Sequence, residues 1–107
     1  MEYLNLYIAG PMRGHDDFNR KEFYRAEAHL GSQNIYKIIN PCKEDKSLNL
    51  TDDQLSSNDG LKIVMSRDLT DITTCDIIYM LTGWEKSEGA KIEHSLATML
   101  NMTIMYQ

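Results

Sequence analysis

The 107-residue chain has little of several features that mark specialised classes of protein. Its two cysteines, Cys42 and Cys75, match no paired metal-binding or redox spacing, so we expect two reduced thiols, with Cys75 in the core, and no metal or cofactor. No apolar run approaches the length of a membrane span, and the first residues lack a basic segment followed by a hydrophobic one. These absences favour a cytoplasmic protein that does not enter a membrane.

Positive charge is also scarce. The chain has 11 lysines and arginines against 16 aspartates and glutamates, which gives a formal net charge of −5. Non-specific binding to nucleic acid needs a basic face, so this balance argues against a nucleic-acid partner, and an anionic small ligand would need a local positive site. The hydrophobic fraction of 42% and the charged fraction of 25% describe a soluble globular protein, and the length predicts one domain over residues 1–107.

Short apolar strands and helical stretches alternate along the chain. The expected strands cover residues 3–10, 35–40, 75–81 and 102–106, and the expected helices cover 17–30, 61–72 and the stretch after 87. This alternation predicts a parallel sheet covered on both faces: an α/β three-layer sandwich, Rossmann-like or flavodoxin-like, with about four or five strands. Residues 42–59 are polar with isolated leucines, which predicts a mobile connection or lid.

Two loops bring candidate binding residues to the carboxyl ends of the strands, where such sheets bind ligands. In the first loop, "AGPMRGH", Gly10 and Gly14 would let backbone N–H groups approach an anion, and Arg13 supplies a forked donor suited to phosphate. The alternative is a tight turn with a solvated arginine. In the loop "TGWEKS", Ser87 could donate to an anion or simply cap the next helix, and Trp84 could stack on a flat ligand or plug the end of the core.

Two carboxylates interrupt the apolar faces of the expected helices. Glu93 lies between the small residues Gly89 and Ala97, and Asp68 falls within an apolar stripe of the preceding helix. An acid that faces a core is costly unless it has a partner. Asp68 could form a structural ion pair with Arg67 or Arg13, or either helix could be rotated so that its acid reaches solvent. Two acids on helices that border the same crevice also favour a functional pair.

Three stretches together resemble the nucleoside 2-deoxyribosyltransferase superfamily. They are Tyr7-Ile8-Ala9-Gly10 in the first strand, Asp68 within "RDLTDITTCD", and the pattern Gly-[Thr/Ala/Val]-x-x-Glu-x-[Gly/Ser]-x-Ala at residues 89–97. The resemblance runs from the first strand to the last, except for residues 42–59. It points in particular to the branch that hydrolyses 2′-deoxynucleoside 5′-phosphates and to small phage and bacterial members of unknown function, of the DUF4406 kind.

The resemblance implies a role for each of three side chains. Glu93 would be the nucleophile that attacks the anomeric carbon of the sugar, with a hollow on either side left by Gly89 and Ala97. Asp68 would bind a sugar hydroxyl and transfer a proton at the departing base, and Tyr7 would hydrogen-bond the nucleophile. The chemistry would then resemble retaining glycoside cleavage through a covalent glycosyl-enzyme.

One departure from the transferase pattern narrows the expected substrate. Transferases that act on unphosphorylated nucleosides have Asp six residues before the nucleophile, where this chain has Ser87, as the monophosphate hydrolases do. The first loop also resembles their Gly-x-x-Arg-Gly, and an Asp would repel phosphate where Ser, the Gly89 N–H and Arg13 would attract it. The residues expected to bind substrate are Gly10, Met12, Arg13, Gly14, Trp84, Ser87 and Gly89.

These observations predict an enzyme that hydrolyses the N-glycosidic bond of a (deoxy)nucleoside 5′-monophosphate and releases free base and sugar phosphate. The alternatives are a nucleoside deoxyribosyltransferase and a non-catalytic protein that binds or sequesters a nucleotide on the same fold. The resemblance also implies a homodimer in which the neighbouring chain completes each site. Met99 and Met102 on the last helix would support that contact, or would simply fill the core.

Overall fold

The computed structural model describes residues 2–107, and its centre is a sheet of four parallel strands. The strands are β1 (Leu4–Ala9), β2 (Tyr36–Ile39), β3 (Ile77–Met80) and β4 (Thr103–Tyr106). They lie in the order β2-β1-β3-β4, and each falls inside a stretch that the sequence predicts to be a strand. The expected parallel sheet is therefore confirmed, with four strands.

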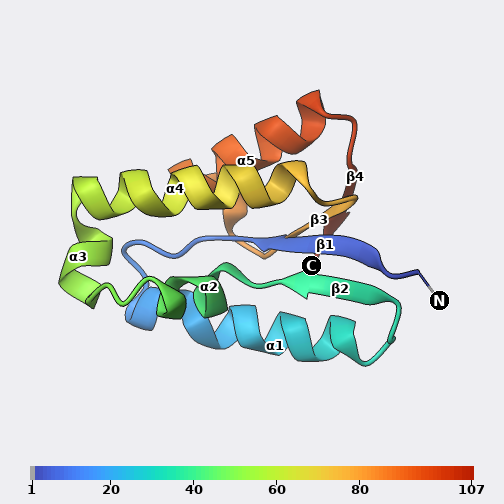
Figure 1. The fold of residues 1–107 in the computed structure, drawn as a ribbon, viewed down its shortest axis with the longest axis horizontal. Helices are drawn as coiled ribbons and strands as arrows, with labels where there is room; N and C mark the ends of the chain where they lie inside the picture. Colours follow the sequence, from blue (N-terminus) through green and yellow to red (C-terminus); the bar gives the residue numbers. More distant parts are fainter. Residues whose placement is uncertain (1) are drawn as a thin grey trace.

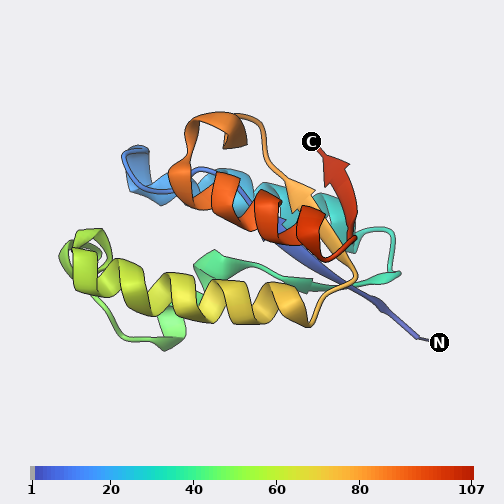
Figure 2. The ribbon, with the colours of Figure 1, turned by 90° about the horizontal axis from the view of Figure 1, so that it is seen from above.

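Helices cover both faces of this sheet (Figure 1). They are α1 (Arg20–Gly31), α2 (Pro41–Ser47), α3 (Asp52–Ser56), α4 (Asn58–Thr73) and α5 (Glu88–Met99). In Figure 1, α1 and α2 lie below the sheet, and α4 and α5 lie above it. Figure 2 shows α4 and α5 side by side along the upper face. The arrangement is the three-layer α/β sandwich that the alternation of elements predicts.

The side chains of β1 alternate between the two helical layers because successive residues of a strand point to opposite faces. Leu6 and Ile8 pack into the core between the sheet and α1. Tyr7 and Ala9 pack into the core between the sheet and helices α4 and α5. All four side chains are at most 1% exposed. Tyr7 therefore reaches the same layer as the two helices that carry Asp68 and Glu93.

The connections of the chain create a switch point between β1 and β3. From β1 the chain passes through α1 to β2 on one side, and from β3 it passes through α5 to β4 on the other. A crevice opens at the carboxyl ends of neighbouring strands where the connections diverge in this way. The loops that leave β1 and β3, which carry Arg13 and Ser87, therefore border the same space.

The first helix begins later than the apolar spacing predicts. Residues Asp16–Asn19 form a short 3-10 turn, η1, in which Asp17, Phe18 and Asn19 have φ values of 50°, 54° and 60°. These values lie in the left-handed region, which is strained for residues other than glycine. The expected start of the helix at residue 17 is therefore wrong, because α1 starts only at Arg20 and Phe18 lies in the turn before it.

Residues 42–59 contain two short helices rather than an irregular connection. Cys42 and Asp45 of α2 and Leu55 of α3 are buried. Helix α3 has a complete capping box, since the Thr51 hydroxyl accepts from the Gln54 N–H and the Gln54 side chain accepts from the Thr51 N–H. The predicted mobility of this segment stays a prediction.

The two cysteines match the expected reduced thiols, but only Cys42 is fully buried. Cys42 and Cys75 are both free thiols, and Cys75 is only partly buried at the margin of the core beneath α4 and α5. Burial raises the pKa of the Cys42 thiol to about 12, so it is unreactive at neutral pH. None of the helices within residues 2–107 has the length and apolar character needed to cross a membrane.

Candidate active site

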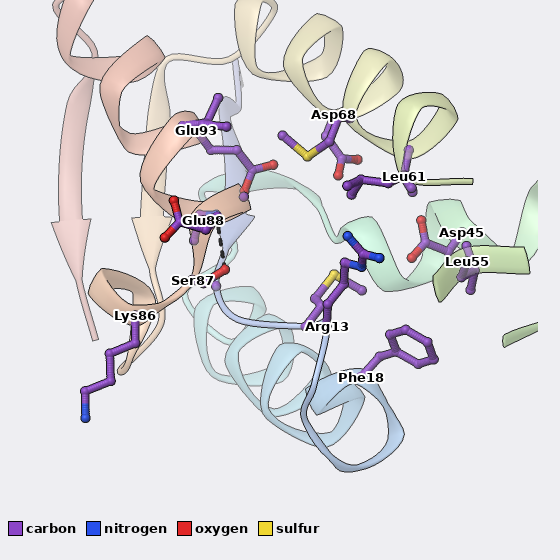
Figure 3. A pocket seen from close by; sticks show the side chains of 17 residues that line it. Arg13, Phe18, Asp45, Leu55, Leu61, Asp68, Lys86, Ser87, Glu88 and Glu93 are labelled. Carbon is purple, nitrogen blue, oxygen red and sulfur yellow. Dashed lines mark hydrogen bonds between the residues drawn. The ribbon is translucent and has the colours of Figure 1, made fainter. Parts of the chain in front are cut away.

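A cavity of about 410 Å³ lies at the switch point, between the loop after β1, helix α3 and the facing helices α4 and α5. Seven of the predicted site residues line it, namely Gly10, Met12, Arg13, Asp68, Ser87, Gly89 and Glu93. Figure 3 shows the carboxyl groups of Glu93 and Asp68 pointing into this space, with Arg13 extending toward them from the opposite side. The structure therefore brings together residues from distant parts of the chain, from Gly10 to Glu93.

Glu93 is the most strongly perturbed acid that lines the cavity. It is 6% exposed, and the Tyr7 hydroxyl donates a hydrogen bond of 2.8 Å to its Oε2. Burial and the nearby Asp68 together raise the pKa of Glu93 to about 8, and the Tyr7 hydrogen bond opposes the rise. Tyr7 is itself fully buried, and burial and the Glu93 charge raise its pKa, so its proton stays on the phenol. The predicted contact between Tyr7 and Glu93 is present.

Asp68 forms the ion pair with Arg67 that the sequence offers as an alternative. The Arg67 Nε lies 3.1 Å and its Nη2 lies 2.5 Å from Asp68 Oδ1, and the carboxyl is 6% exposed. Burial raises the pKa of Asp68 to about 6, and the charge and hydrogen bonds of Arg67 limit the rise. This pairing does not remove Asp68 from the cavity, because its carboxyl still lines the wall beside Glu93.

Ser87 caps helix α5, and its hydroxyl oxygen accepts from the Ala90 N–H at 3.3 Å. The hydroxyl proton remains free to donate into the cavity, which also meets the positive end of the twelve-residue helix. Arg13 lies opposite, and its Nη2 donates to the Ser56 carbonyl at 2.6 Å. Lys86 and Glu88 also border this end, but in Figure 3 their charged groups point away from the cavity. Arg13 is therefore the cation that faces the cavity here.

The small residues serve different purposes from those that the sequence suggests. A Cβ on Gly10 would lie 2.7 Å from the Leu81 Cβ, so packing between the ends of β1 and β3 already requires glycine there. Gly89 lines the cavity, and a Cβ there would meet only Met65 at 3.7 Å. Ala97 is fully buried in the core beneath α5 and does not line the cavity. The hollow therefore lies on one side of Glu93 only, which corrects the expectation of two.

Two of the residues predicted to bind substrate, Gly14 and Trp84, are not brought to the cavity. Gly14 has a φ of 82° and turns the loop, with nothing within 4 Å of a Cβ placed on it. Trp84 lies in the short turn η2 (Trp84–Lys86) and stacks on His94, with ring centroids 4.2 Å apart and an interplanar angle of 20°. His94 in turn lies 2.9 Å from the Tyr106 hydroxyl through its Nε2. Trp84 thus belongs to an aromatic cluster over β4 and packs against the core, so its expected stacking on a ligand has no support here.

Sequence reasoning missed two residues of the cavity wall, Phe18 and Asp45. Phe18 contributes an aromatic ring to the cavity wall, and the Arg20 guanidinium lies 5.0 Å from the centre of that ring. Asp45 of α2 lines the cavity at 6% exposure, and Arg67 lies between Asp45 and Asp68. A buried acid in a polar segment gives no periodic signal, and the left-handed turn that presents Phe18 has no glycine to mark it.

The remainder of the cavity is apolar. Met12, Leu55, Leu61, Val64, Met65 and Ile92 supply most of its wall. Within residues 2–107, no group of three or more His, Cys, Asp or Glu side chains is placed to hold a metal ion. The site therefore combines a buried pair of acids, one arginine, one helix N-terminus and an apolar wall, which is the composition of a small-molecule site rather than of a macromolecular surface.

Fold and site together define an α/β protein with two buried carboxylates at the switch point of a parallel sheet. The chain belongs to the DUF4406 family, a domain of unknown function, whose family model matches residues 4–106. No curated protein matches the chain. The family match covers all four strands and every residue of the cavity.

Proposed function

We propose that this protein hydrolyses the N-glycosidic bond of a (deoxy)nucleoside 5′-monophosphate and releases free base and sugar phosphate. The observation that carries the proposal is a buried carboxylate, Glu93, that accepts a 2.8 Å hydrogen bond from Tyr7 and faces a cavity it shares with a second acid, Asp68. The motifs around these three residues resemble those of the nucleoside 2-deoxyribosyltransferase superfamily, which supports the same assignment.

The proposed reaction has two balanced steps. In the first, a Glu93 oxygen attacks C1′ and forms a glycosyl ester, the C1′–N bond breaks, and its electron pair leaves with the base, which takes a proton from Asp68. In the second, a water attacks C1′, its proton returns to Asp68, and the Glu93 carboxylate is released with the configuration at C1′ retained. Tyr7 holds Glu93 in one orientation during both steps.

The phosphate is assigned to the end of the cavity between Arg13 and the start of α5. The free proton of the Ser87 hydroxyl, the backbone N–H groups at the helix N-terminus and the Arg13 guanidinium all suit a dianion. The chain has a net charge of −5, so this local site is what would make an anionic substrate acceptable. The apolar wall and Phe18 would then contact the sugar and the base.

The two acids do not start in the protonation states that the reaction needs. With a pKa of about 8 for Glu93 and about 6 for Asp68, the shared proton at pH 7 lies on Glu93 in most molecules. The reactive form, with Glu93 ionised and Asp68 protonated, is then the minority form, because Glu93 holds its proton more tightly than Asp68 does. We therefore expect kcat/KM to be bell-shaped between about pH 6 and pH 8 and modest at its maximum.

The direct test is to incubate the protein with a panel of nucleoside and deoxynucleoside 5′-monophosphates and to measure free base by chromatography. Release of base and sugar phosphate is the expected result. Transfer of the sugar to an added second base would indicate the deoxyribosyltransferase instead. Tight binding measured by calorimetry without any release would indicate a non-catalytic nucleotide-binding protein, and neither binding nor release would overturn the proposal.

The predicted homodimer is kept as part of the proposal. On α5, Met99 is 77% and Ile92 is 52% exposed, and Ile92 also lines the cavity, so a second copy packed on this helix would cover the open side of the site. Met102 packs against the core instead, as the sequence alternative allows. Light scattering at micromolar concentration should give the mass of a dimer, and a monomer with full activity would contradict a shared site.

A further inference from the structure

One guanidinium lies between two carboxylates that come from different helices and face the same cavity. The Arg67 Nη2 lies 2.5 Å from Asp68 Oδ1 and 2.7 Å from Asp45 Oδ1. Asp68 follows Arg67 on α4, whereas Asp45 belongs to α2, in the segment joining β2 to α4. Both acids line the cavity, and Arg67 is not among the residues that do. Arg67 therefore contacts the cavity wall through these two acids.

The ion-pair group is buried and incompletely satisfied. Asp45 and Asp68 are each 6% exposed, and the Arg67 side chain is 17% exposed. Within the described residues, Asp45 Oδ1 and Arg67 Nη1 are buried without a well-aligned hydrogen bond. A buried ion pair whose hydrogen bonds are incomplete contributes little to stability, since desolvation offsets the attraction. This cost makes a purely stabilising role a poor explanation of the cluster.

We propose that Arg67 is a positioning residue that holds the Asp68 carboxyl against the cavity and sets its charge, and that Asp45 competes with Asp68 for the same guanidinium nitrogen. The inference rests on the proposed function, in which Asp68 delivers a proton to the departing base. The competition also links the proton donor on α4 to the placement of α2, because moving Asp45 away would leave Arg67 wholly to Asp68.

The charges around Asp68 give the direction of each effect. Arg67 favours ionised Asp68, whereas Asp45 on α2 and Asp71 on the same helix oppose it by repulsion, and Glu93 on α5 keeps its proton in the range where Asp68 titrates. Tyr7 of β1 and the buried Cys42 thiol of α2 also lie near this cluster and stay neutral, and Arg13 faces it across the cavity. Removing the guanidinium should therefore raise the pKa of Asp68, and removing the Asp45 charge should lower it.

The test compares Asp45→Asn with Arg67→Gln in two measurements. The first is an NMR titration of the Asp68 side-chain carboxyl, which needs no turnover. In Arg67→Gln its pKa should move from about 6 to roughly 7 or above, and in Asp45→Asn it should move below its wild-type value. The second is the pH profile of base release, whose acid limb should move to higher pH in Arg67→Gln and to lower pH in Asp45→Asn.

Controls separate this inference from the proposed function and from misfolding. Arg25→Gln removes an arginine whose ion pair with Glu22 lies on the exposed side of α1, and it should leave both measurements unchanged. Circular dichroism shows whether Arg67→Gln folds, and Asp45→Asn tests the opposite shift if it does not. The inference would be overturned, even with an active enzyme, if both variants moved the pKa of Asp68 in the same direction or left it unchanged. Wild-type protein that releases no base would overturn the proposed function and leave the NMR result standing.

Discussion

The two walls of the cavity are built by different means. On the wall formed by α4 and α5, Asp68 and Glu93 are each 6% exposed and are fixed by the partly buried Arg67 and the fully buried Tyr7. On the wall formed by the loop after β1 and by α3, the stabilising hydrogen bond and ion pair lie at the surface. There Arg13 donates to a backbone carbonyl, and Arg20 bonds Asp52 at 2.8 Å.

In the proposed function, this difference places the reacting groups on one wall and the binding groups on the other. Exposed ion pairs are worth about 0–1 kcal/mol, so the wall held by Arg13 and Arg20 can be displaced at little cost. Buried acids held by buried partners stay where the core places them. Changes on the α4–α5 wall should therefore alter the rate of the chemical step, and changes on the opposite wall should alter substrate binding.

The largest effect is expected for Glu93→Gln. An amide cannot form the glycosyl ester, so base release should fall by at least about three orders of magnitude while the fold stays intact. Chromatography of the free base measures the loss, and circular dichroism checks the fold. Glu85→Gln, which removes an exposed carboxylate from the turn η2, is the matched control and should retain activity. Wild-type turnover by Glu93→Gln would remove Glu93 as nucleophile.

Asp68→Asn tests whether Asp68 is the proton donor and Glu93 the nucleophile. Loss of the proton donor should lower base release roughly a hundredfold, within the usual range for general acid catalysis. The residual activity should rise with pH, because only ionised Glu93 is then required, and its pKa should lie below about 8 once the Asp68 charge is gone. Residual activity that falls as pH rises would mean that Glu93 acts as the acid and that the two roles are exchanged.

The buried Glu93 should also make stability depend on pH. Its pKa is raised from 4.5 to about 8 in the folded protein, so between these values the unfolded chain releases the proton and the folded protein keeps it. The free energy of unfolding should therefore fall as pH rises from about 4.5 to 8. Glu93→Gln removes this term and should be more stable than wild type at pH 8, by on the order of 1–3 kcal/mol. Urea unfolding of wild type and Glu93→Gln at pH 5 and pH 8 measures these free energies. The prediction would be contradicted if the two proteins differed in the free energy of unfolding by the same amount at both pH values.

On the opposite wall, Arg13→Ala should act on binding. A charge-assisted contact with phosphate is worth roughly 1.5–3 kcal/mol, so KM for a monophosphate should rise about tenfold or more while kcat changes little. The preference for a monophosphate over its nucleoside should shrink accordingly. Arg25→Ala, on the exposed side of α1, is the control. Equal processing of a nucleoside and its monophosphate by the wild type would rule out the phosphate site.

The smallest effect compares the two aromatic residues. Phe18→Ala should raise KM by roughly fivefold to tenfold, because the ring lines the cavity and this change corresponds to the lower end of the about 1–3 kcal/mol that base–aromatic stacking contributes. Trp84→Ala should leave KM unchanged and lower the melting temperature instead, since Trp84 packs against the core and stacks on His94. The reverse pattern would return ligand stacking to Trp84.

Much of the fold, and the position of the two buried acids, could be predicted from the sequence alone. Apolar runs locate all four strands, and the alternation of strands and helices determines the parallel sheet. Acids at apolar positions of a helix single out Asp68 and Glu93, and motif resemblance adds Tyr7 as the partner of Glu93. These features depend on the repeat of the helix or strand that carries them, so neighbouring residues are enough to reveal them.

Only the tertiary structure decided how the cavity is closed. The left-handed turn that presents Phe18 is accompanied by contacts of Arg20 with Asp17, with Asp52 thirty-two positions away and with the ring itself. Asp45 joins the site because α2 folds against α4, where Arg67 meets it. Trp84 turns to His94 and away from the cavity because α5 and β4 place a stacking partner beside it. Each outcome depends on a contact between segments that are distant in the sequence. A local pattern of apolar residues does not predict which distant residue a side chain will contact.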